Sequence, residues 1–156
     1  MSPSSIAENY QLLVVGIEMS SCNATIARDM EEQGRKAEEL GLATTIRHRV
    51  DANKYLALLW NWSPGGEFPL MSAAEVTSTR GQPQGCLVRR FPRCDYAIFP
   101  MRGVIPNLEE PWREILDWYP FDPAGFTTTI RRYDELSGTG EILIPLFPNL
   151  KPESMV

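Results

Sequence analysis

Residues 140–146 read Gly-Glu-Ile-Leu-Ile-Pro-Leu, an apolar and β-branched run that carries one carboxylate, Glu141, near its start. This composition is typical of a β-strand. Side chains alternate between the two faces of a strand, so Ile142 and Ile144 share one face while Glu141 and Leu143 share the other. If the isoleucine face packs into a core, the carboxylate lies beside apolar neighbours on the opposite face. A carboxylate in that position either pairs with a cation of the protein or is available to a cation from outside.

The composition indicates an ordinary globular domain. The chain has 156 residues, of which 43% are hydrophobic and 22% are charged, and this length is sufficient for one domain with its own core. The formal net charge is -5. Proteins that grip a phosphate backbone need a positive surface, so we expect no direct contact with nucleic acid.

The cysteines and the single histidine exclude two further classes of protein. Cys22, Cys86 and Cys94 form no Cys-x-x-Cys pair, and His48 is the only histidine. This pattern predicts neither a disulfide framework nor a zinc site, and we expect no metal and no cofactor. There is no signal peptide and no apolar run of about 18 residues, so we expect a cytoplasmic protein that does not enter a membrane.

Hydrophobic periodicity and turn residues predict an α+β domain that spans residues 1–156. The linker at 78–84 separates two halves, about 10–80 and 85–148, and each half reads as strand, helix, strand, strand, with the order of the second half offset by an added strand. The predicted strands are 11–17, 44–50, 55–62, 68–77, 86–91, 94–101, 126–133 and 140–147. One helix is predicted from a cap at Ser20, Ser21 or Asn23 to Leu40, where Gly41 stops it, and a second from about 107–111 to Tyr119.

No motif for covalent or phosphate chemistry occurs in the chain. A glycine-rich phosphate loop, a nucleophile elbow and a dinucleotide fingerprint are all missing from the sequence. The lone His48 lies between two arginines, and we interpret it as structural. The sequence therefore predicts no catalytic residue.

The aromatic residues suggest one kind of binding chemistry. The chain has four Trp, five Tyr and six Phe; ring faces attract positive charge, and a carboxylate neutralises that charge in a poorly hydrated pocket. Two simpler interpretations remain open. Trp60, Trp112 and Trp118 are, in the first, simply core residues, which is the more common role of large aromatic side chains. Glu141 could pair with Arg131 or Arg132 across the final hairpin, which would leave no free charge for a ligand.

Several runs of residues, taken in order, resemble one known family. They are residues 91–103, residues 112–120 (Trp-Arg-Glu-Ile-Leu-Asp-Trp-Tyr-Pro), Tyr133 and the final strand with Glu141. Together they resemble the GyrI-like effector-binding family, which includes the small-molecule-sensing domains of Rob-type and BmrR-type transcription regulators. The resemblance covers residues 10–148. It implies a duplicated strand-helix-strand-strand unit that forms a concave antiparallel sheet of about eight strands with two helices.

The resemblance also implies a function and a site. The expected protein is a stand-alone domain that binds amphipathic or cationic small molecules in a cleft with aromatic walls and an acidic floor. The acid of the family's last strand falls on Glu141, but a second acid, two positions before Tyr133, is replaced here by Arg131. This replacement argues against ligands with two positive charges. The predicted ligand-binding residues are Glu141, Trp60, Phe99, Trp112, Tyr119 and Tyr133.

Two other functions stay open at this point. Some relatives hydrolyse electrophilic, cyclopropane-containing natural products, and Glu141 would then act as the base. The chain could also be a protein-interaction module of the gyrase-modulating kind. We expect binding rather than catalysis, and a homodimer is also left open.

Overall fold

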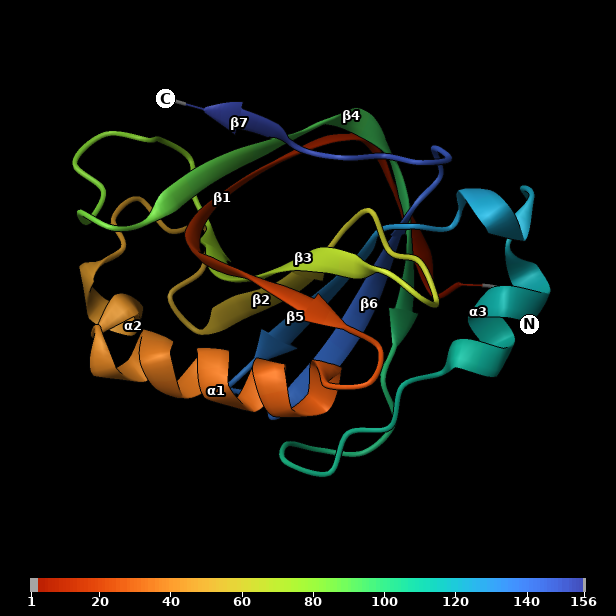
Figure 1. Cartoon of the computed structure of the whole chain (residues 1–156), viewed down its shortest axis with the longest axis horizontal. Coiled ribbons are helices and arrows are strands. Elements are labelled where there is room, and N and C mark those ends of the chain that lie inside the picture. Colours follow the sequence, from red (N-terminus) through yellow and green to blue (C-terminus); the bar gives the residue numbers. More distant parts are fainter. Residues whose placement is uncertain (1–2, 156) are drawn as a thin grey trace.

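The computed structural model describes residues 3–155, and Figure 1 shows the path of the chain. The first half contains β1 (Ser5–Cys22), α1 (Ile26–Glu39), α2 (Leu42–Thr45), β2 (Lys54–Leu59) and β3 (Glu67–Glu75). The second half contains β4 (Leu87–Pro100), α3 (Trp112–Trp118), a 3-10 turn (Pro123–Gly125), β5 (Thr129–Asp134), β6 (Thr139–Pro145) and β7 (Glu153–Met155). The order strand-helix-strand-strand thus occurs twice, as predicted, with the short α2 added to the first half.

The sheet closes on itself. Its strand order is β1-β3-β2-β5-β6-β4, and β4 also pairs with β1, so six strands form a closed antiparallel, barrel-like sheet. The short β7 pairs with β4 outside this ring. Figure 1 shows the strong curvature of β1 and β4 that allows the closure. The expectation of about eight strands and two helices was therefore wrong in both counts.

Two local features explain the difference in strand number. The predicted strand at 44–50 is replaced by the end of α2 and a loop, which forms an isolated bridge between Arg49 and Val76 instead of a strand. The predicted strands at 86–91 and 94–101 are one strand, because β4 continues through Pro92. Proline lacks a donor for the ladder, but here it lies where the register against β1 is already irregular, so the strand bends without ending.

Helix α1 ends where the sequence predicts and starts later. Its C-cap is Leu40, and Gly41 follows with a φ of 65°, a conformation that glycine adopts without steric cost. None of the three predicted cap residues occupies the N-cap position, because β1 extends to Cys22. Thr25 lies there instead.

The interior of the barrel holds one apolar cluster to which every strand of the ring contributes. Its buried members are Leu12, Val14, Leu56, Leu58, Trp60, Met71, Ala73, Phe91, Tyr96, Ile130, Leu143 and Leu150. The helices lie on the outer face: α1 packs on β1 and β3, and α3 packs on β4 and β6. Ile142 and Ile144 lie under α3 while Leu143 points inward, so the predicted faces of the last strand are confirmed.

The helices leave part of the outer face of the sheet less covered. Strands β2 and β5 lie between the part of the sheet that α1 covers and the part that α3 covers. The outward side chains of Tyr55, Ala57 and Tyr133 on these strands are only partly buried. No helix among residues 3–155 is long and apolar enough to cross a membrane.

Candidate functional site

Glu141 is paired within the protein. The register of β5 against β6 places Arg132 directly opposite Glu141. Arg132 Nε donates to Glu141 Oε1 at 2.7 Å, and Nη2 lies 2.5 Å from the same oxygen. The two side chains are 18% and 30% exposed, respectively. Of the two alternatives that the sequence left open for this carboxylate, the structure therefore shows the cross-strand ion pair.

The pair belongs to a polar group at one mouth of the barrel, which we call the barrel-mouth cluster (Tyr10, Glu75, Arg132 and Glu141). The Tyr10 hydroxyl donates to Glu75 Oε2. Burial raises the pKa of Glu75 although the Tyr10 hydroxyl and the charges of Arg132 and Lys54 act in the opposite direction. The pocket beside this cluster measures about 150 Å³. Sites for drug-sized ligands usually measure about 300–1,000 Å³, so this pocket suits only a smaller group.

Two of the predicted aromatic residues fill the core. Trp60 is 6% exposed inside the barrel and packs edge-on against Phe91, with ring centroids 6.0 Å apart. Phe99 is 3% exposed under α3 and packs edge-on against Trp118. Both side chains are therefore core residues, which is the core interpretation that the sequence allowed for Trp60.

The other three predicted aromatic residues lie on the outer face near α3. Trp112 and Tyr119 both pack edge-on against Phe126, and Tyr133 belongs to the same partly buried group. Glu141 shares the inner face with Leu143, so the predicted residues are divided between the two faces of the sheet. Their contact with a ligand stays a prediction.

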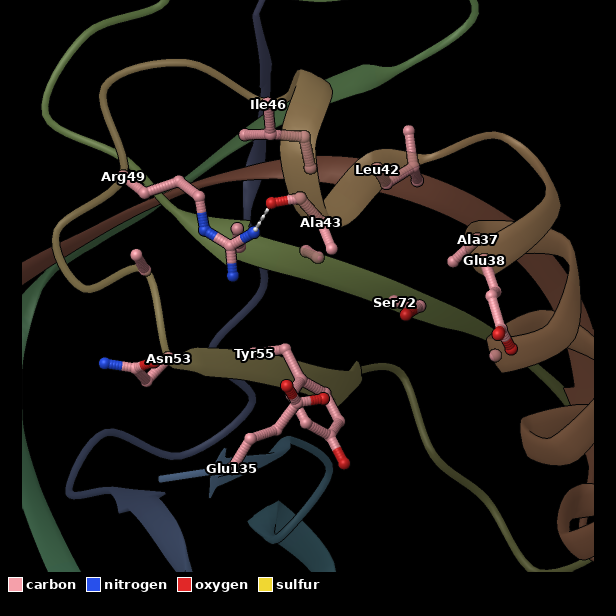
Figure 2. Close-up of a pocket in the computed structure, with 14 residues that line it drawn as sticks. Ala37, Glu38, Leu42, Ala43, Ile46, Arg49, Asn53, Tyr55, Ser72 and Glu135 are labelled. Carbon is pink, nitrogen blue, oxygen red and sulfur yellow. Dashed lines mark hydrogen bonds between the residues drawn. The ribbon is translucent and has the colours of Figure 1, made fainter. Parts of the chain in front are cut away.

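A larger pocket, about 500 Å³ in volume, opens on the outer face between the first two helices and strands β2 and β3 (Figure 2). We call it the helix-face pocket. Its lining residues are Gly34, Ala37 and Glu38 of α1, then Leu42, Ala43, Ile46, Arg49, Ala52, Asn53, Tyr55, Ser72, Ala73, Ala74 and Glu135. The volume lies within the usual range for small-molecule sites.

One wall of the helix-face pocket is aromatic. Tyr55 stacks on Tyr133, with ring centroids 5.0 Å apart and an interplanar angle of 25°. Tyr133, one of the predicted ligand-binding residues, thus lies next to the pocket through its contact with Tyr55, which lines it. Burial raises the pKa of Tyr55, and it raises the pKa of Tyr133 to about 12. Both phenols are therefore neutral near pH 7 and present uncharged rings.

Three charged side chains surround this pocket, and they differ in their hydrogen-bond and ion-pair partners. Arg49 Nη1 donates to the Ala43 carbonyl at 2.9 Å and Nη2 donates to the Lys54 carbonyl at 2.7 Å, so its guanidinium is held by backbone oxygens. Glu38 and Glu135 are exposed, and neither forms a direct ion pair with a residue in the described part of the chain, although the charge of Glu135 acts on the Arg49 guanidinium across the pocket. In Figure 2 the Glu135 carboxylate lies beside the Tyr55 ring, and Glu38 projects from α1 on the other side.

Sequence reasoning missed this pocket. Its space comes from small side chains, such as Gly34, Ala43 and Ser72, at positions that face one another only after α1 and α2 have packed on the sheet. Small residues on a helix are only weak evidence for a pocket, because they are equally common on exposed surfaces. Glu135 comes from a turn that lies far along the chain, and no local pattern connects it with α1.

Metal chemistry finds no support in the described residues. Within residues 3–155 no group of three or more His, Cys, Asp or Glu side chains is arranged to hold a metal ion. Cys22, Cys86 and Cys94 are free and partly buried.

Comparison with known proteins identifies the fold. No family model matches the chain, and no curated protein matches it. The structure superposes on SAV2435 bound to tetraphenylphosphonium with a TM-score of 0.66 and 17% identity, covering 94% of this chain and 93% of that one. The chain has the fold of that protein. The likeness is consistent with the predicted resemblance to the GyrI-like family.

Two further structures show the same likeness. A protein from Staphylococcus aureus MU50, provisionally assigned to transcription regulation, gives a TM-score of 0.66 with 16% identity over 94% of this chain and 97% of that one. An integron cassette protein from the mobile metagenome of Vibrio cholerae gives 0.61 with 19% identity over 94% and 95%. At these identities the likeness concerns the fold.

Proposed function

We propose that this chain binds a drug-sized, amphipathic organic cation in the helix-face pocket. The observation that carries the proposal is the pocket of about 500 Å³, which combines apolar side chains with the Tyr55 ring and two carboxylates that have no ion-pair partner in the described chain. The likeness to SAV2435 bound to tetraphenylphosphonium, a lipophilic cation, supports the same class of ligand.

The pocket offers three favourable terms to such a ligand. Apolar groups are removed from water against Leu42 and Ile46, at about 25 cal/mol per Å². A cation near the face of Tyr55 gains about 0.5–2 kcal/mol, depending on how far it is desolvated. Glu38 and Glu135 are exposed, so their attraction is screened by solvent and mainly favours a positive ligand over a neutral one.

Pairing of Glu141 weakens the alternative of a hydrolase. In that reaction Glu141 would accept a proton from water, but its carboxylate already accepts hydrogen bonds from Arg132. The lone pairs that would receive the proton are thus already engaged by a guanidinium. We therefore propose a protein that acts by binding rather than by catalysis, and we propose that it does so in the cytoplasm.

The test is a calorimetric titration of the protein with tetraphenylphosphonium and, separately, with triphenylphosphine oxide, a neutral compound of similar shape. Ala43 is exposed on α2 and lines the pocket. We expect Ala43→Phe to weaken both compounds about tenfold or more, since it fills the space that they need. We expect Glu135→Gln to weaken the phosphonium about two- to fivefold and to leave the oxide unchanged.

Glu141→Gln is the matched control, because it removes a carboxylate from the opposite face of the sheet. We expect it to leave both affinities unchanged. If Glu141→Gln abolishes binding of the phosphonium while Ala43→Phe has no effect, the ligand lies at the barrel mouth and our assignment of the pocket is wrong.

A further inference from the structure

Arg131 is a buried cation on the outer face of the sheet. The residue is 7% exposed. Its Nε donates to Glu110 Oε2, and its Nη2 donates to Glu110 Oε1 at 3.1 Å. The guanidinium carbon lies 5.6 Å from the centroid of the Trp112 ring. A carboxylate on one side and an indole on the other thus hold one positive group.

The carboxylate is itself oriented. Trp112 Nε1 donates to Glu110 Oε1 at 2.7 Å, so three N–H groups converge on one carboxylate. Burial alone would raise the pKa of Glu110, but the hydrogen bonds and charge of Arg131 outweigh burial and hold this pKa below its ordinary value. The carboxylate is therefore charged while Arg131 is in place.

These contacts reproduce the chemistry that recognises an external organic cation. An aromatic face together with a charged, oriented carboxylate binds guanidinium groups through cation–π attraction and paired hydrogen bonds. Trp112 begins α3 and Glu110 lies just before its N-cap, whereas Arg131 comes from β5, so the cage and its occupant come from different segments of the chain. The cage and its occupant meet only in the folded chain.

We propose that Glu110 and Trp112 form a guanidinium-binding cage whose occupant is the chain's own Arg131. The class of ligand that fits the cage is an alkylguanidinium. While Arg131 is in place, it fills the cage and excludes external cations from it. The cage does not depend on that pocket, because Glu110, Trp112 and Arg131 do not line it.

The fit of Arg131 is incomplete, which argues for a replaceable occupant. Its Nη1 is buried and has no hydrogen-bond partner among the described residues. A free alkylguanidinium is not restrained by the backbone of β5, so it can adjust its position in the cage more freely than Arg131 can.

The test replaces the tethered guanidinium by a free one. Arg131→Ala keeps Cβ, and ethylguanidinium supplies the atoms beyond it; ethylurea is the neutral compound of the same shape. We expect ethylguanidinium to bind Arg131→Ala about tenfold or more tightly than it binds the wild type, from the recovered charge pairing and ring contact. We expect ethylurea to bind neither protein.

Two controls keep the proposal falsifiable. The double variant Arg131→Ala with Glu110→Gln retains the space but lacks the charge, and it is expected to lose the gained binding. If Arg131→Ala alone is unfolded, ethylguanidinium is expected to restore its circular dichroism at concentrations where ethylurea does not. Equal effects of the two compounds, on the folded or the unfolded variant, overturn the proposal. A parallel titration with tetraphenylphosphonium shows separately whether the helix-face pocket binds.

Discussion

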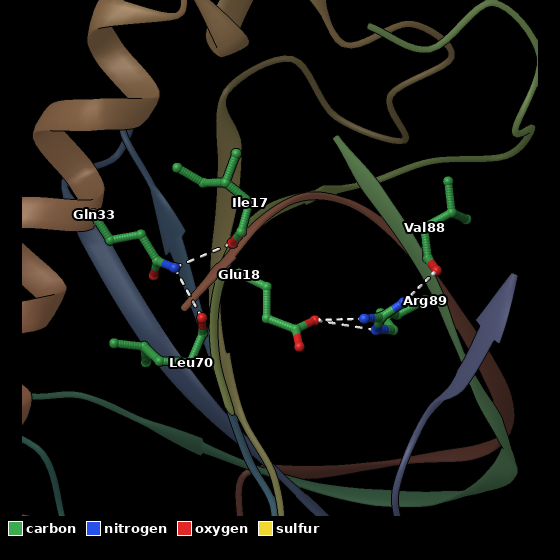
Figure 3. A network of polar contacts seen from close by, with 6 residues as sticks. All are labelled: Ile17, Glu18, Gln33, Leu70, Val88 and Arg89. Atoms are coloured by element: carbon green, nitrogen blue, oxygen red, sulfur yellow. Dashed lines mark hydrogen bonds and ion pairs between the residues drawn. The ribbon is translucent and has the colours of Figure 1, made fainter. Parts of the chain in front are cut away.

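Gln33 offers the sharpest test of how α1 is held against the sheet. Its side-chain amide is buried and donates to the Ile17 carbonyl of β1 at 3.1 Å and to the Leu70 carbonyl of β3 at 2.8 Å (Figure 3). One amide nitrogen therefore connects the helix to two neighbouring strands. Gln33→Met keeps the length of the side chain and removes both hydrogen bonds.

The expected loss follows from these two contacts. A hydrogen bond within a protein contributes about 0.5–1.5 kcal/mol net, so the loss of two costs about 2 kcal/mol. Methionine has similar volume, so a cavity adds little. For a chain of this size, a loss of about 2 kcal/mol lowers the midpoint of thermal unfolding by roughly 4–8 °C.

Urea unfolding followed by tryptophan fluorescence measures the change. Glu32→Met, at an exposed position of the same helix, is the matched control and is expected to change stability by less than about 0.5 kcal/mol. Because Gly34 and Ala37 of α1 line the helix-face pocket, Gln33→Met is also expected to weaken the binding of tetraphenylphosphonium. A loss of stability no larger than that of the control would refute the role that we assign to the buried amide.

Three further changes test other parts of the structure. Burial raises the pKa of Glu75, so the folded chain holds the Glu75 proton more tightly than the unfolded chain does, and the stability that this proton contributes is lost as the pH rises from 4.5 through the raised pKa. The urea midpoint of Glu75→Gln should therefore rise relative to that of the wild type as the pH is increased. Parallel curves of midpoint against pH would contradict this. An added Cβ at Gly16 would lie 1.9 Å from the Ser72 carbonyl oxygen, so Gly16→Ala is expected to cost about 3 kcal/mol of unfolding free energy, whereas Gly65→Ala, with no atom within 4 Å, should cost almost nothing. Glu141→Gln breaks the cross-strand pair and is expected to cost about 1 kcal/mol in the same assay; an unchanged midpoint would show that the pair contributes no stability.

The fold was largely predictable because its main signals are local. The alternation of Ile142, Leu143 and Ile144 assigned the faces of the last strand correctly. Gly41 marked the end of the first helix, since few other residues adopt its left-handed conformation at low cost. The order of elements also followed from local patterns. Closure of the sheet did not, because the pairing of β1 with β4 joins segments about 80 residues apart, and no local pattern reports such a contact.

The candidate sites were harder to predict than the fold, because they depend on contacts between residues far apart in the chain. From the sequence, Arg131 and Arg132 were equally suitable partners for Glu141, and a register shift of one residue would exchange them. The folded register places Arg132 opposite Glu141 and turns Arg131 to the other face, where it meets Glu110. A carboxylate does meet an indole in the structure, but the acid is Glu110 rather than the predicted Glu141, and the cation beside them is the chain's own Arg131.

Composition and periodicity thus established the α+β class, the repeated unit and the absence of motifs for metal or nucleophilic chemistry in the sequence. Only the tertiary structure decided which charges neutralise one another and where space remains. The physical reason is range: strand and helix preferences act over a few residues, whereas an ion pair or a pocket needs side chains such as Gly34 and Glu135, about 100 positions apart, to meet within a few ångströms.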